Sequence, residues 1–193
     1  MYTSRAIVAA LAFAVALPVT AAAQTHALDR GSFLVGGGAS FTRNGGEVDG
    51  ESLDPSTEWS LSPRLMYFVL PGLALGGEAS LSRDKSGGAT FTTYGAGPAV
   101  AYYFGASRAR PRPWYPYIEG GVRLLRTRSN RDITGLEESL TGFHVAGGIL
   151  LMLSDAVGLD GELFFDVNHQ EIGLVEVRTN VLGFAIGFSA FLF

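Results

Sequence analysis

Alternating hydrophobicity with a period of two is the feature of this sequence that most restricts its fold. Segments of about ten to fourteen residues alternate between apolar and mixed side chains, and clusters of Gly, Asn, Asp, Ser and Pro separate them. Side chains with that period point to opposite faces of a β-strand. The sequence therefore predicts eight strands, near residues 31–42, 58–69, 73–83, 90–104, 114–126, 140–153, 157–168 and 177–193.

One face of these segments is apolar, and the other face carries polar or charged side chains. In 157–168, every second residue is valine, leucine, glycine or phenylalanine, and acidic or polar residues occupy most positions between them. An even number of such strands predicts an all-β fold, an eight-stranded antiparallel up-and-down β-barrel, and the features described next predict that it is a transmembrane β-barrel. The charged or ionisable residues on the mixed faces are Arg64, Glu78, Glu119, Arg123, His144, Asp160, Glu162 and Asp166.

Alternation alone leaves open which face points outward. A soluble lipocalin-like barrel would show the same pattern with its charges in water, whereas a membrane barrel turns them toward its interior. Aromatic residues cluster at the strand ends beside one set of turns, which is typical of the interfacial girdle of a membrane barrel. These residues are Tyr67, Phe68, Tyr102, Tyr103, Phe104, Trp114, Tyr115 and Tyr117.

The connections between the segments also differ between the two ends of the predicted barrel. Tight turns at 70–72 and 154–156 lie at the end that carries the aromatic residues. With both chain termini in the periplasm, the longer polar connections all face the outside, which favours the membrane barrel. The longer connections are 43–57, 84–89, 127–139 and 169–176.

The composition excludes several classes of function. The chain of 193 residues is 47% hydrophobic, which suits one folded domain, and it contains no cysteine. Disulfides, thiolate metal sites, cysteine nucleophiles and a lipoprotein anchor are therefore excluded. A formal net charge of −4 gives no reason to expect nucleic acid as a partner.

The first residues have the features of a secretory signal peptide. One positive charge at Arg5 precedes an apolar run over 6–17, and small residues end at Ala23 before Gln24. The apolar run is short for a membrane-spanning helix. We therefore expect a signal peptide over 1–23, export from the cytoplasm, and a barrel domain over 24–193.

Several stretches resemble the small eight-stranded outer membrane protein β-barrel family, which includes OmpA-type, OmpX-type and opacity-type barrels. They are the segment PRLMYFVLPGLALGGEASLS from Pro63, the strand end 102–105, the strand start 116–119 and the terminal Phe193. The resemblance implies a monomer in the outer membrane, in contact with lipid and lipopolysaccharide, that the barrel-assembly machinery inserts. The polar loops either contact an extracellular ligand or only keep the surface soluble. The peptidoglycan-binding domain of OmpA-type proteins is not found after the barrel, so we expect no cell-wall tether.

The interior charges define the expected site. An eight-stranded barrel is just wide enough for side chains to fill it, so the inward acids and arginines should pair with one another. We therefore expect a structural or surface-interaction role, with a charged network that plugs the interior. Two alternatives remain open: a narrow gated pore whose pairs exchange to admit ions, and a soluble periplasmic lipid-binding barrel.

Catalytic and metal sites find little support in the sequence. Outer-membrane lipid A deacylases use a His-x-Ser pair, because a serine nucleophile needs an adjacent base. Here Ala146 stands two positions after His144, and Glu171 stands two positions after His169. No calcium-loop or phosphate-loop pattern appears. We therefore expect no enzymatic activity, no metal site and no cofactor.

The last strand departs from the alternation, because both of its faces are apolar. A bulge near Ser189 would place Phe184, Ile186 and Phe188 on the lipid face together with the terminal aromatic residues. Because an aromatic end resembles the recognition signal of outer-membrane barrels, we expect an assembly signal. Its residues are Phe191 and Phe193.

Overall fold

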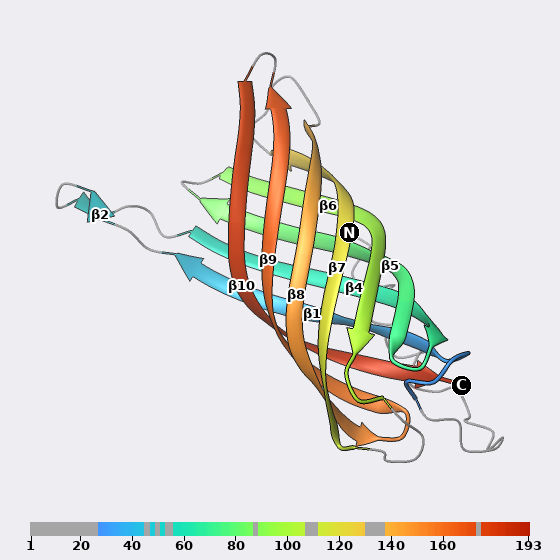
Figure 1. Cartoon of the computed structure of the whole chain (residues 1–193). Helices are drawn as coiled ribbons and strands as arrows, with labels where there is room; N and C mark the ends of the chain where they lie inside the picture. Colours follow the sequence, from blue (N-terminus) through green and yellow to red (C-terminus); the bar gives the residue numbers. More distant parts are fainter. Residues whose placement is uncertain are drawn as a thin grey trace, which may run out of the picture.

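The computed structural model describes residues 27–44, 47–48, 51–52, 56–86, 89–106, 112–129, 138–172 and 175–193. Eight long strands form one closed antiparallel barrel, which confirms the predicted fold (Figure 1). Each strand pairs with its neighbours in the chain, and the first strand closes against the last. The barrel strands are β1 (Phe33–Asn44), β4 (Ser56–Leu70), β5 (Leu73–Ser86), β6 (Ala89–Tyr103), β7 (Trp114–Ser129), β8 (Glu138–Ser154), β9 (Val157–Ile172) and β10 (Val175–Leu192).

Two further strands lie within the segment expected to be a polar loop. β2 (Glu47–Val48) and β3 (Glu51–Ser52) pair in a small sheet of their own. The signal peptide expected over 1–23 lies outside the described residues. In the described part of the chain, no helix is long and apolar enough to cross a membrane.

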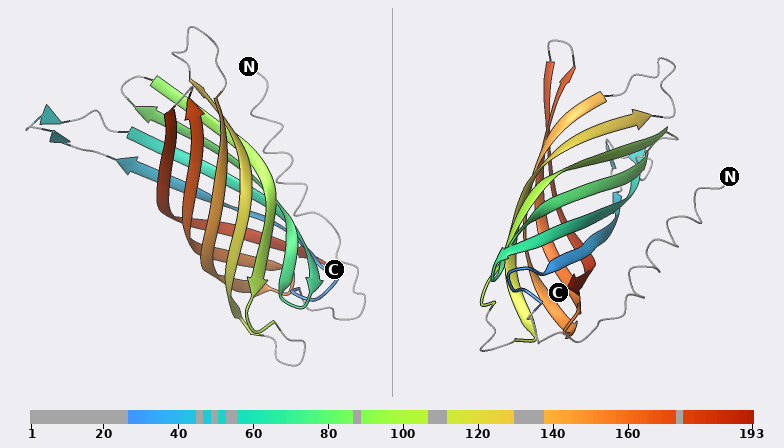
Figure 2. Two further views of the ribbon diagram at one scale, coloured as in Figure 1. Left: turned by 45° about the horizontal axis from the view of Figure 1, so that its top comes forward. Right: turned by 90° about the vertical axis from the view of Figure 1, so that its right-hand side faces the viewer.

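The barrel has two unlike ends (Figure 2). At the turn end, β4 joins β5 through Pro71 and Gly72, and β8 joins β9 through Asp155 and Ala156, as the tight turns of the sequence predict. Gly72 has a φ of 78°, which other residues rarely adopt, so this turn depends on glycine. The start of β1 and the end of β10 lie at the same end, and we call the opposite end the loop end.

The outer surface of the barrel is apolar, and the charged side chains lie inside. Leu65, Val145 and Leu163 are 55%, 60% and 64% exposed, whereas Arg64 and Glu119 are buried. Water would disfavour so continuous an apolar surface, and a lipid environment accepts it. This arrangement contradicts the soluble lipid-binding alternative.

The aromatic cluster at the turn end divides between the two faces, which corrects the expectation of a single outer girdle. Tyr67, Tyr102 and Trp114 are exposed on the outside, between 39% and 46%. Adjacent residues of a strand point to opposite faces, so their neighbours turn into the lumen. The buried aromatic residues are Phe68, Tyr103, Tyr115 and Tyr117.

The bulge expected near Ser189 is absent, and that prediction is wrong. β10 pairs with β1 and β9 without a register shift at this residue. Phe184 and Phe188 do face outward, but unbroken alternation also carries Phe191 into the lumen, where it is 2% exposed. The inward position of Ser189 is stabilised by its hydroxyl, which donates a 2.6 Å hydrogen bond to Asp160.

Because the outer surface is apolar, the free energy cost of a charge on it should depend on how deep in the bilayer that charge lies. Val122 lies at the centre of β7 and faces outward, so Val122→Arg should lower the free energy of unfolding in lipid vesicles by about 2 to 4 kcal/mol. Leu75 also faces outward but lies close to the turn at Gly72, where an arginine reaches the interface and costs about 1 kcal/mol or less. Urea titrations of both variants provide the measurement, and equal losses would contradict this placement of the bilayer.

Candidate functional site

A layer of aromatic side chains fills the lumen at the turn end. The ring of Tyr103 lies 5.7 Å from Phe68 and 5.1 Å from Tyr117, measured between centroids. Phe191 lies 6.3 Å from Phe68 in the same layer. The segment before β1 closes the layer from below, where the buried Leu28 accepts a 2.8 Å hydrogen bond from the backbone N–H of Gly72.

Arg64 of β4 forms the first charged layer above these rings. Its guanidinium lies 2.8 Å from Glu119 and 3.0 Å from Asp160. A third carboxylate, that of Glu162, lies at 3.5 Å and accepts a 2.7 Å hydrogen bond from the hydroxyl of Tyr117. The guanidinium also lies 5.6 Å from the centre of the Tyr117 ring, so it joins the charged layer to the aromatic one.

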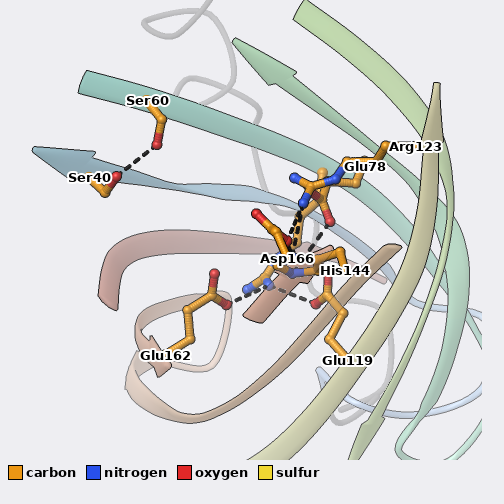
Figure 3. Close-up of polar contacts among 9 residues, drawn as sticks. Ser40, Ser60, Glu78, Glu119, Arg123, His144, Glu162 and Asp166 are labelled. Atoms are coloured by element: carbon orange, nitrogen blue, oxygen red, sulfur yellow. Dashed lines mark hydrogen bonds and ion pairs between the residues drawn. The ribbon is translucent and has the colours of Figure 1, made fainter. Parts of the chain in front are cut away.

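Arg123 of β7 forms a second charged layer (Figure 3). Its guanidinium lies 2.9 Å from Glu78 of β5 and 2.5 Å from Asp166 of β9. Nδ1 of His144 lies 2.6 Å from the same Asp166 oxygen.

All eight ionisable residues singled out in the sequence thus lie in the lumen within these two layers. The alternation of each strand sends them inward, and the barrel brings together residues that lie far apart in the chain. Five carboxylates share two guanidinium groups and one imidazole, so the network carries an excess of negative charge. Pairing offsets the desolvation cost that each of these buried charges would otherwise impose.

Three members of the network also have the composition of a metal site. Glu78, Glu119 and His144 each offer a ligand atom, and these atoms lie within 4.8 Å of one another. However, Arg123 and Arg64 already hold the two carboxylates, at 2.9 and 2.8 Å. A divalent cation at this point would face two guanidinium groups, and their repulsion disfavours it. We therefore assign these residues to the ion-pair network.

A polar cavity of about 430 Å³ lies above the network toward the loop end. Small hydroxyl side chains line much of it, and two of them, Ser40 and Ser60, are hydrogen-bonded at 2.8 Å (Figure 3). Glu58 also lines it, and its register partner on β5 is Asp84, so the two acidic side chains lie on the same face of neighbouring strands. One buried oxygen of Asp84 accepts no hydrogen bond from the described residues.

Sequence reasoning misses several residues of the site. It places Tyr117 and Tyr103 in the outer girdle, and it treats Ser189 only as the place of a bulge. The sequence does indicate that Tyr117 points inward, because this residue has the same parity along β7 as Glu119 and Arg123. No pattern in the sequence points to Leu28, which contacts the turn at Gly72, more than forty residues further along the chain.

Comparison with known proteins agrees with this architecture. No curated protein sequence matches the chain significantly. Among solved structures, the Neisserial surface protein A (NspA) is similar, with a TM-score of 0.54 and 16% identity over 82% of this chain and 96% of that chain. The N-terminal β-barrel domain of OprF from Pseudomonas aeruginosa is similar with a TM-score of 0.51 and 11% identity, over 84% of this chain and 98% of that chain. At such identities the likeness concerns the fold alone.

The sequence itself carries the family assignment. Residues 8–188 match the family described as the outer membrane protein beta-barrel domain, which covers most of the chain. The apolar outer surface, the charged lumen and the short turns at one end are what such a barrel requires. The chain therefore belongs to the outer membrane protein beta-barrel family.

Proposed function

We propose that this protein is a closed, non-enzymatic outer-membrane barrel with a structural or surface-interaction role at the cell envelope. The observation that carries the proposal is the filled lumen, in which the Arg64 layer lies directly on the aromatic layer. A barrel that is filled in this way anchors its loops in the membrane without conducting solutes.

The partners follow from the same proposal. We propose that the apolar surface contacts outer-membrane lipid, that the loop end contacts lipopolysaccharide and an extracellular ligand, and that the barrel works as a monomer after insertion by the barrel-assembly machinery. Export would depend on residues 1–23. In the connection 43–57, the side chains of residues 43–56 lie outside the described residues, as do residues 130–137, so these contacts rest on the sequence.

A gated pore is the second candidate, and the cavity above the network favours it. The cavity reaches Arg64 and Arg123, so an exchange of ion pairs would extend it toward the turn end. The aromatic layer argues against a pore, because Phe68, Tyr103 and Tyr117 would also have to move, and all three are buried.

Single-channel recording in planar bilayers separates the two candidates. We expect no stable conductance from the wild-type protein, and none from Glu78→Gln or Arg123→Met, because the aromatic layer remains in place. A heat-modifiable gel band controls for folding of each variant. A stable wild-type conductance that Glu78→Gln changes would support the pore instead.

A deletion strain tests the envelope role. We expect greater detergent sensitivity if the role is structural and weaker adhesion if the role is recognition. Complementation by a variant lacking residues 47–51 distinguishes them, because a structural role does not need this loop. A deletion strain with neither change would contradict both forms of the proposal.

A further inference from the structure

The seam between β1 and β10 is paired over only part of its length. In the described part of the chain, the register runs from Phe33 opposite Leu192 to Ala39 opposite Ile186 and stops there. β1 continues to Asn44, and β10 begins at Val175, so both strands extend well beyond the last pair. Figure 1 shows the two strands diverging toward the loop end, whereas β1 keeps its register with β4 along its whole length.

The divergence begins at the depth of the bilayer. A strand of a membrane barrel takes about 9 to 11 residues to cross the hydrocarbon layer. Phe33 lies among the outer aromatic residues near the turn end. A crossing of this length that begins at Phe33 extends beyond Ala39. Backbone groups that lack a partner are unfavourable in hydrocarbon, so a seam that opens there needs an occupant or a function.

The polar cavity reaches this seam. Gly38 and Ser40 of β1 line it on one side of the opening, and residues 180–185 of β10 line it on the other. The same cavity is lined by Glu162 and Asp166 of the charged network. Its volume of about 430 Å³ lies within the range of small-molecule sites. The cavity therefore borders the part of the seam where the described pairing of β1 with β10 has stopped.

The groups around the cavity determine what it can hold. Its two guanidinium groups are already bound to carboxylates, whereas Glu58 lies beside Asp84 on the same face of the neighbouring strand. A positively charged group would relieve the repulsion between these two acids. At the outer edge of the seam, Leu182 and Phe184 are 78% and 56% exposed and offer an apolar path.

We propose that the seam between β1 and β10 admits a single-chain amphiphile with a cationic head group from the outer leaflet. The head group binds in the cavity near Glu58 and Asp166, and the chain leaves the barrel along Leu182 and Phe184. This binding activity goes beyond the closed-barrel role, because it uses a lateral opening and needs no passage through the aromatic layer.

Engineered cysteines test the opening directly, since the chain has none of its own. Continuing the register would place Phe41 opposite Phe184, so the variant Phe41→Cys/Phe184→Cys reports on the open part of the seam. The matched control Val35→Cys/Ala190→Cys replaces partners that the structure pairs. In vesicles, we expect oxidation to join the control pair at least tenfold faster than the seam pair. Equal rates would show a closed seam and overturn the proposal.

Binding of a defined probe tests the ligand class. Protein folded in phosphatidylcholine vesicles should retain dodecylammonium in equilibrium dialysis above the level of empty vesicles, and at least tenfold more tightly than dodecanoate or butylammonium. Glu58→Gln should weaken this binding about fivefold. Asp155→Asn at the turn end is the matched control and should leave it unchanged. No excess binding, or equal binding of dodecanoate, would overturn the proposal.

Discussion

Replacing Arg64 by methionine is expected to lower the free energy of unfolding by about 3 to 5 kcal/mol. Methionine keeps most of the packing volume but removes the cation that Glu119, Asp160 and Glu162 share. These carboxylates would remain buried, where the free energy of an uncompensated charge is high. Urea titration of protein folded in lipid vesicles measures the change through the transition midpoint at constant slope.

Two comparisons make this result specific to the network. Arg123→Met should cost less, because His144 lies 2.6 Å from Asp166 and 3.9 Å from Glu78 and can supply a positive charge in place of the guanidinium. Arg83→Met is the surface control, because this side chain lies outside the charged network, and it should change the free energy of unfolding by about 0.5 kcal/mol or less. A loss from Arg64→Met that merely equals this control would contradict the buried network.

Replacing Phe191 by alanine is also expected to lower the free energy of unfolding, by about 3 to 5 kcal/mol. The ring is buried in the aromatic layer beside Phe68, so its removal leaves a cavity that the barrel wall cannot collapse to fill. Phe193→Ala should cost less than about 1 kcal/mol in the same vesicle assay, because its ring is exposed beyond the end of β10.

In the cell, Phe193→Ala should have a larger effect than its small change in stability indicates. If Phe193 is part of the assembly signal, Phe193→Ala reduces the heat-modifiable band in the outer membrane although the purified variant remains stable. Deleting Leu192 and Phe193 should reduce it further, because Leu192 pairs with Phe33 where the barrel closes. A two-residue deletion within 47–51 serves as the control. Equal yields of folded barrel from the two deletions would contradict an assembly role for this end.

The sequence is most informative about the direction of side chains within each strand. A period of two determines which residues share a face. Together with the aromatic strand ends and the unequal connections, it places Arg64, Glu119 and Asp160 on inner faces. The same rule places Phe68 and Phe191 inside. Clustering near the turns instead suggests an outer girdle for Phe68, and the bulge expected near Ser189 suggests the lipid face for Phe191. At these two positions parity is the better guide.

Pairing between distant residues is decided by the tertiary structure alone. The sequence pattern indicates that Arg64 and Glu119 point inward. It contains no information on the stagger of the strands, which sets the height of each residue in the lumen. That stagger brings Arg64 to Glu119 and Asp160, and Arg123 to Glu78 and Asp166.

The seam illustrates the same limit. The sequence by itself determined eight strands, their inner and outer faces and the end with tight turns, because each depends on residues that are close in the chain. Only the tertiary structure decided that β1 stops pairing with β10 after Ala39 and Ile186, and that a cavity lies there. The physical reason is that barrel closure joins the two most distant strands, whose register depends on the tilt and twist accumulated over all the others.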